Sequence, residues 1–264
     1  MTQIAADARC GPDEGERLQA LVTAPGRKIE LAGLANLRDV GGYPTAGGDG
    51  AVVPWRTLLR SDALHQLEPA GLQQLAGLRL RTIVDLRTDL EAEIAPSPLD
   101  GLTVRHTRVS ILGSDLESLP QTGLDDLYAF VIDERGAAIA DAIRPLCAGQ
   151  AFPALVHCSA GKDRTGIVIA LVLAVLGVPD DIIAADYALS GGYLDPRHIS
   201  AIGQLQASAG LGDELAEELL VSPPHLILDA LGRARASHGS AEGYLLAHGL
   251  SDADLAALRA ALAG

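Results

Sequence analysis

Lysine is almost absent from this chain of 264 residues. Only Lys28 and Lys162 occur among its 20 Lys and Arg residues, whereas Asp and Glu number 34, which gives a formal net charge of -14. A chain this acidic is not expected to bind nucleic acid or to be drawn strongly to anionic membranes. An anionic ligand would therefore have to be met by a local cluster of positive groups.

Cysteine and long apolar runs are also scarce. The three cysteines, Cys10, Cys147 and Cys158, are an odd number without a repeating pattern, so they indicate a reducing compartment rather than a disulfide framework. Residues 1–30 lack the apolar core of a secretory signal, and the apolar run at 166–177 is too short for a bilayer, which needs about 20 residues. We expect a cytoplasmic protein without an integral membrane segment, although export without a cleaved signal stays open.

One motif carries most of the chemical information. Residues 157–166 read HCSAGKDRTG, between a short apolar run at 152–156 and a long one at 167–176. This pattern predicts a loop that joins a buried strand to a buried helix. Such a loop presents unpaired amides and the positive end of the helix dipole to a phosphate. We therefore predict that a phosphate or another oxyanion binds to the loop residues Ser159, Ala160, Gly161, Lys162 and Gly166.

Three side chains of the motif suit phosphoryl transfer. Cys158 stands where a helix N-terminus and cations favour a nucleophilic thiolate. Arg164 offers a planar fork for two phosphoryl oxygens, and Thr165 places a hydroxyl near the sulfur. Together they predict transfer through a phosphocysteine intermediate, without a metal ion. The histidines show no metal-ligand spacing with cysteine or acidic residues, so neither a metal nor a cofactor is expected.

The motif resembles the signature loop of the cysteine-dependent protein tyrosine phosphatases. Its interior is similar to that of the bacterial enzymes related to a secreted mycobacterial phosphatase, a family that also acts on phosphoserine, phosphothreonine and phosphoinositides. Further similar segments follow in order at 36–43, 59–64, 84–87, 185–187 and 243–245, so the resemblance covers nearly all of the chain from about residue 30.

The resemblance implies a fold and a domain organisation. The expected fold is α/β, a mixed sheet flanked by helices with a helical C-terminal part. A polar N-terminal segment, 1–27, would precede a single phosphatase domain, 28–264, in which helices at about 196–238 would form a lid.

The resemblance also suggests roles for further residues. Many relatives carry their general acid in a Trp-Pro-Asp sequence, which this chain lacks. Asp163, inside the loop, becomes the candidate acid and Asp115 the alternative. His157 would orient the loop. Asp85 and Arg87 follow the buried run 80–84, and we expect them to tie neighbouring loops together.

The substrate is less constrained than the chemistry. Protein phosphotyrosine is the expected substrate. Lys162 could meet a second phosphate, which leaves a phosphoinositide or a dual- or triple-specificity phosphatase as the alternative. Rival hypotheses from other classes are a non-catalytic phosphate-binding module and another cysteine enzyme, such as a sulfur transferase or an arsenate reductase.

Periodicity predicts the remaining elements. Strands are expected at 28–35, 52–60, 81–86, 102–109 and 152–157. Helices are expected at 69–78, at 124–147 with a break near Gly136, and then at 180–190, 196–208, 213–221, 224–237 and 251–262.

Overall fold

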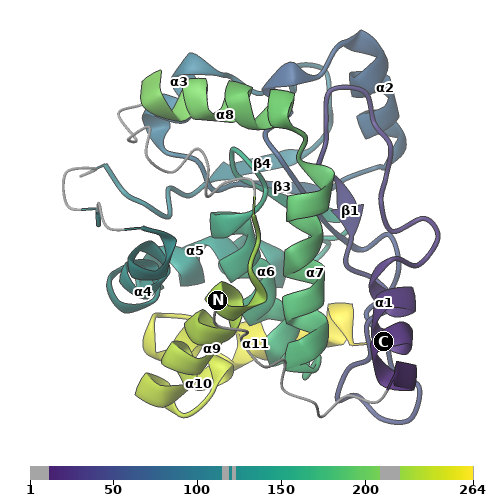
Figure 1. Cartoon of the computed structure of the whole chain (residues 1–264), viewed down its shortest axis with the longest axis vertical. Coiled ribbons are helices and arrows are strands. Elements are labelled where there is room, and N and C mark those ends of the chain that lie inside the picture. The colour runs from purple at the N-terminus through teal and green to yellow at the C-terminus, as the bar shows by residue number, and fades with distance from the viewer. Residues whose placement is uncertain (1–11, 115–118, 121–122, 209–220, 264) are drawn as a thin grey trace, which may run out of the picture.

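The fold is built on a mixed five-stranded sheet (Figure 1). The computed structural model describes residues 12–114, 119–120, 123–208 and 221–263. The strands are β1 Arg38–Asp39, β2 Leu58–Ser61, β3 Thr82–Asp85, β4 Arg105–Arg108 and β5 Ala154–His157, and their order across the sheet is β1-β2-β5-β3-β4. Only β1 runs antiparallel to its neighbour, so β5 lies between two parallel strands at the centre. The predicted α/β class with a mixed sheet is confirmed.

Helices account for most of the remaining described residues. They are α1 Pro12–Val22, α2 Pro69–Gly77, α3 Asp89–Ile94, α4 Leu124–Glu134, α5 Gly136–Cys147, α6 Asp163–Val175, α7 Asp180–Tyr193, α8 Pro196–Ser208, α9 Pro224–His238, α10 Ala241–Ala247 and α11 Asp252–Leu262, with a short 3₁₀ turn at Leu64–Gln66. Among the described residues, no helix is both long and apolar enough to cross a bilayer.

The two faces of the sheet are covered separately. Strand side chains alternate between the faces. Val84 and Val156 therefore join the large core under α4, α5, α6 and α9, whereas Ile83 and Leu155 join a smaller core with Leu75 of α2. Helix α6 is apolar on nearly all sides, as expected of a helix at the centre of a core. This burial holds its N-terminus firmly against the end of β5.

Several segments differ from the sequence prediction. The strand expected at 52–60 is limited to β2, Leu58–Ser61, and the elements β1, α3 and α10 were not predicted. Residues 28–35 do not form a strand, and only isolated bridges occur there. Gly33 has a φ of +94°, and a side chain at this position would collide with the backbone of Gln66, so the chain turns instead. The polar N-terminal segment contains α1, which packs against α7 and contributes Val22 to the large core.

The C-terminal helices show which part of the suggested lid belongs to the core. Helix α9 packs against α4, α6, α7 and α10 and buries Leu226 and Ile227. It therefore contributes to the large core. Helix α8 contacts α3 and places Ile199 and Ile202 beside Ala160 of the signature loop (Figure 1). Of the helix predicted at 213–221, only Val221 is among the described residues.

Candidate active site

The signature loop occupies the turn between β5 and α6, at the carboxyl end of the central strand. Gly161 has a φ of +67°, and a Cβ atom here would collide with the backbone of Ser61 and Asp62. Gly166 lies against the ring of Tyr187, where a Cβ atom would approach Tyr187 Cδ2 to 2.9 Å. Both glycines are therefore needed for close packing, the first of them also for its backbone conformation.

The carbonyl groups of the loop are held on its outer side. Arg60 Nη2 donates to the carbonyl of Gly161 at 2.9 Å, and Asn36 Nδ2 donates to that of Ala160 at 2.9 Å. The amide of Ala63 donates to the carbonyl of Ser159 at 3.0 Å. In a planar trans peptide the N–H points away from the preceding C=O. The amides that follow these carbonyls, at residues 160–162, therefore point toward the inside of the loop.

Arg60 is itself fixed by a buried ion network. Its Nη1 lies 2.8 Å from Asp186 Oδ2, and Arg38 Nε lies 3.3 Å from Asp186 Oδ1. Tyr43 also donates to Asp186, at 2.9 Å. Burial alone would raise the pKa of Asp186, but Arg38 and Arg60 bring it below its ordinary value. Asp186 is thus an anion that orients two arginines behind the loop.

Glu91 immobilises the guanidinium of Arg164. The two side chains form a two-point contact, with Nη1–Oε2 at 2.6 Å and Nη2–Oε1 at 2.8 Å. Ser159 Oγ also donates to Glu91, and Thr88 forms a reciprocal capping box with it at the start of α3. Burial would raise the pKa of Glu91, yet Arg164 and these donors lower it to about 2. The fork of Arg164 is therefore preorganised beside the loop amides.

Lys162 and Asp163 lie at the start of α6 in different surroundings. Lys162 is fully buried, and its Nζ donates to the carbonyl of Val221 at 2.8 Å and lies 3.5 Å from Asp163 Oδ1. Asp163 keeps 16% of its side chain exposed and accepts a 2.8 Å hydrogen bond from Tyr128. The hydroxyl of Tyr128 also lies 2.7 Å from that of Tyr187. Asp163 thus combines access to solvent with a fixed orientation.

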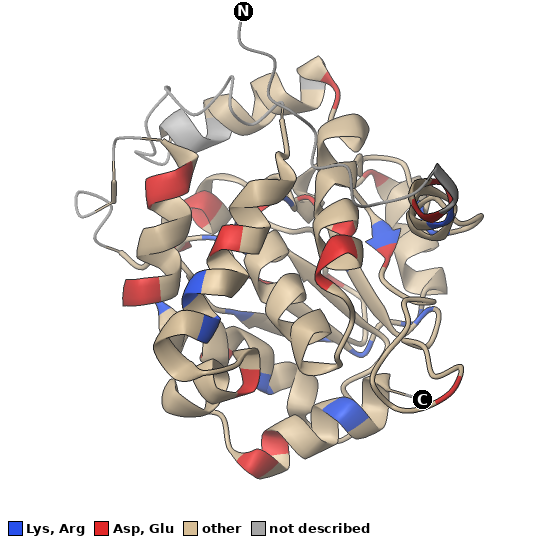
Figure 2. Ribbon diagram, turned by 60° about the horizontal axis from the view of Figure 1, so that its bottom comes forward, with Lys and Arg blue, Asp and Glu red and all other residues tan. Residues whose placement is uncertain are grey.

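Several basic side chains lie inside the protein, together with the carboxylates of Asp39, Asp62, Asp85, Glu91 and Asp186. Arg27, Arg38, Arg60, Arg87, Lys162 and Arg164 are all buried. Figure 2 shows Asp and Glu recurring along the helices of the surface. Arg164 and Lys162 therefore bring positive groups to the loop within a molecule whose net charge is strongly negative.

Comparisons with known proteins agree with this geometry. Residues 29–264 match the model of the "Tyrosine phosphatase family". The chain is 30% identical to "Triple specificity protein phosphatase PtpB" of Mycobacterium tuberculosis over 89% of its length and 99% of that protein. It is 28% identical to "Tyrosine-protein phosphatase" of Nostoc commune, over 80% of this chain and 75% of the relative.

The chain belongs to the tyrosine phosphatase family. Among solved structures, that of TpbA from P. aeruginosa covers 76% of this chain and 91% of its own, with 20% identity and a TM-score of 0.36.

Most of the predicted site residues of this phosphatase family member lie in or beside the loop. Cys158 is buried at the end of β5, and the hydroxyl of Thr165 is buried without a hydrogen-bond partner among the described residues. Cys147 lies elsewhere, in α5, where burial raises the pKa of its thiol to about 11. Asp115 lies outside the described residues.

Asp85 and Arg87 stand behind the loop. Arg87 binds both carboxylate oxygens of Asp85 and reaches the carbonyl of Ala95 and the hydroxyl of Ser97, so it ties the end of β3 to the segment after α3. His157 connects the pair to the loop, because its Nε2 lies 3.9 Å from Asp85 Oδ2. Burial lowers the pKa of His157 to about 4.

Sequence reasoning missed Glu91, Arg60 and Asp186 as supports of the site. The pattern Thr88-x-x-Glu91 was a visible signal for a capping box and a short helix. Arg60 and Asp186 lie within segments that matched the family, but their pairing joins residues far apart in the chain.

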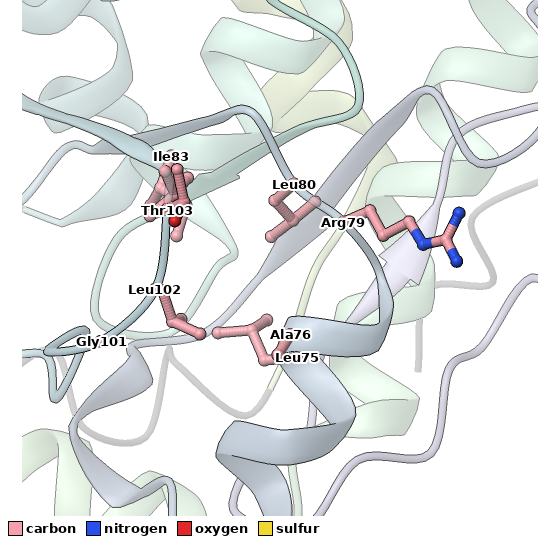
Figure 3. A pocket seen from close by; sticks show the side chains of 9 residues that line it. Leu75, Ala76, Arg79, Leu80, Ile83, Gly101, Leu102 and Thr103 are labelled. Carbon is pink, nitrogen blue, oxygen red and sulfur yellow. The ribbon is translucent and has the colours of Figure 1, made fainter.

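The cavity shown in Figure 3 is a separate feature. It has a volume of about 220 Å³ and lies between α2, the start of β3 and residues 101–104. Most of the side chains that line it are apolar, and the side chain of Arg79 points away from it (Figure 3). The cavity is at the amino end of the parallel strands, whereas the signature loop is at their carboxyl end.

Proposed function

We propose that this protein is a cysteine-dependent phosphatase that hydrolyses phosphomonoesters, with protein phosphotyrosine as its main substrate. The proposal rests mainly on the hydrogen bonds that the loop carbonyls accept on the outer side of the loop. Because of these bonds, the loop amides point inward beside Cys158 and the guanidinium of Arg164, which Glu91 holds in place. Amides and a guanidinium in this arrangement match the oxygens of a phosphoryl group.

The first chemical step would be attack by the Cys158 thiolate on phosphorus. An S–P bond forms while the P–O bond to the leaving group breaks. Asp163 is placed to give its proton to the leaving oxygen, because its side chain is partly exposed at the loop and oriented by Tyr128. Arg164 holds two of the phosphoryl oxygens during the step.

The second step would release phosphate. Water attacks the phosphocysteine, the S–P bond breaks, and the Asp163 carboxylate takes the proton of the water molecule. The hydroxyl of Thr165, which is buried and has no hydrogen-bond partner among the described residues, is available to donate to the departing thiolate. A reducing cytoplasm would keep Cys158 available for the next cycle.

The contacts of Lys162 favour a single phosphate over two. Its ammonium group already binds the Val221 carbonyl and lies near Asp163, so a second phosphate would have to displace these contacts. A dual- or triple-specificity phosphatase remains the alternative, since the name of the mycobacterial relative describes three specificities. A phosphoinositide is the other alternative substrate. We also propose α8 as a cover of the site, because its Ile199 and Ile202 pack beside Ala160.

The deciding experiment measures phosphate release from a phosphotyrosine peptide, a phosphoserine peptide and mono- and bis-phosphorylated inositol lipids in dispersed form. Cys158→Ser should abolish release, whereas Cys147→Ser should retain it. The tyrosine peptide should be the best substrate. Faster release from the inositol lipids would instead identify a phosphoinositide as the main substrate. Binding of phosphate without any release dependent on Cys158 would instead indicate a non-catalytic module.

A further inference from the structure

Three neighbouring strands bring two histidines and an aspartate to one face of the sheet. In the parallel register, Asp85 is paired with His157 and Ile83 with His106. Paired residues point to the same face, as do residues two apart in a strand. Asp85 Oδ2 lies 3.9 Å from His157 Nε2 and 3.8 Å from His106 Nε2, and the three atoms all lie within 4.8 Å of one another.

The hydrogen bonding of His157 leaves one ring nitrogen unsatisfied. Its Nδ1 lies 3.2 Å from the carbonyl oxygen of Cys158, which can only accept, so Nδ1 carries the proton of this contact. Nε2 is buried and has no hydrogen-bond partner among the described residues. In the neutral ring this atom presents a lone pair. The Nε2 lone pair of His157 and the Oδ2 atom of Asp85 are thus two electron donors 3.9 Å apart. A cation between these two atoms would be attracted to both.

We propose that Asp85, His106 and His157 form a binding site for a divalent transition metal such as Zn²⁺. Two imidazoles and one carboxylate are a ligand set typical of zinc with an open fourth position. Zinc bonds of about 2.0–2.2 Å in a tetrahedron separate the ligand atoms by about 3.3 Å. The observed 3.8 and 3.9 Å therefore require a small contraction.

His106 can supply that movement. It lies on the edge strand β4 with 34% of its side chain exposed, so its ring can turn and a metal ion can enter beside it. Arg87 fixes the carboxylate of Asp85 through Nε and Nη2, which both donate to Oδ2. The positive charge of Arg87 also weakens the site, so its affinity should fall below that of structural zinc sites.

The chain gives no sign of this site in its local spacing. The three ligands stand at positions 85, 106 and 157, and only the sheet register brings them together. A bound metal would hold the His157 ring, whose Nδ1 supports the carbonyl of Cys158. The proposal concerns metal binding alone and does not depend on phosphatase activity.

The test uses the Cys158→Ser protein, because the thiol could bind zinc itself. Zn²⁺ affinity is measured by competition with a chromophoric chelator, and Co²⁺ absorption reports the coordination geometry. His106→Gln removes a ligand from an exposed strand position. His225→Gln is the matched control, because His225 is also exposed and lies 3.4 Å from the carboxylate of Asp125.

We expect the Cys158→Ser protein and its His225→Gln derivative to bind Zn²⁺ equally, with Co²⁺ bands of four-coordinate intensity. His106→Gln should weaken binding by about tenfold or more and reduce those bands. Equal zinc affinity in the His106→Gln and His225→Gln proteins would overturn the proposal. Absence of zinc binding at micromolar concentration would overturn it as well.

Discussion

Substitution of Glu91 by Gln removes the buried negative charge that holds Arg164. The pKa of Glu91 falls from 4.5 to about 2 in the folded protein, because the attraction of Arg164 and the hydrogen bonds of Ser159 and Thr88 exceed the cost of burial. At about 1.4 kcal/mol per pH unit, this difference corresponds to about 3 kcal/mol of stability. Removal of one partner of a buried ion pair costs about 3–5 kcal/mol, which agrees.

The pH dependence of this loss has a defined sign. Because folding lowers the pKa of Glu91, its contribution is complete above about pH 4.5 and disappears as the pH falls toward about 2. Urea denaturation at neutral pH should therefore show Glu91→Gln less stable than the parent by about 3 kcal/mol, and the difference should shrink in acid.

Glu93→Gln is the matched control for this experiment. Glu93 lies in the same helix but is exposed, so its substitution should leave stability nearly unchanged. Equal urea midpoints for the two variants at neutral pH would refute the reasoning. A difference that stays constant down to pH 3 would show that the charge of Glu91 is not its source.

The remaining predictions concern proton transfer and the loop backbone. Asp163→Asn should abolish the basic limb of the pH–rate profile for an aryl phosphate, because Asn cannot donate the proton, and an unchanged profile would assign that role elsewhere. Tyr128→Phe should lower kcat, since it removes the hydrogen bond that orients the Asp163 carboxylate. Tyr187→Phe, which removes only the outer hydroxyl of the pair, should lower kcat less. Gly161→Ala should lower the free energy of unfolding, measured with urea, by about 1–3 kcal/mol and should reduce activity, because its Cβ would collide with the Ser61 carbonyl. Full activity in this variant would contradict the loop geometry.

The central part of the fold could be predicted from the sequence, because the apolar residues that define its periodicity are the same residues that pack in the core. The strand before the loop and the apolar helix after it are both where periodicity placed them. The break near Gly136 is also confirmed, since α4 ends at Glu134 and α5 begins at Gly136. In contrast, the segment 28–35 was predicted to be a strand, which the turn at Gly33 prevents.

The site was predictable in its motif but not in its supports. The spacing of Cys158 and Arg164 marks the loop within ten residues of sequence. The partner of Arg164 is 73 residues away, and the buried Lys162 donates to the carbonyl of Val221, which belongs to another segment. Such pairings depend on the way the elements pack, which periodicity does not describe.

The outward bonds of the loop have a consequence for how this protein folds. The loop reaches its geometry only when Asn36, Arg60, Glu91, Tyr128 and Asp186 have all been brought to it from distant parts of the chain. Contacts of such long sequence separation form late, after the closure entropy of the intervening segments has been overcome. During refolding, helical structure should consequently return before the anion-binding loop is formed. Recovery of catalytic activity would therefore report that the whole domain has folded.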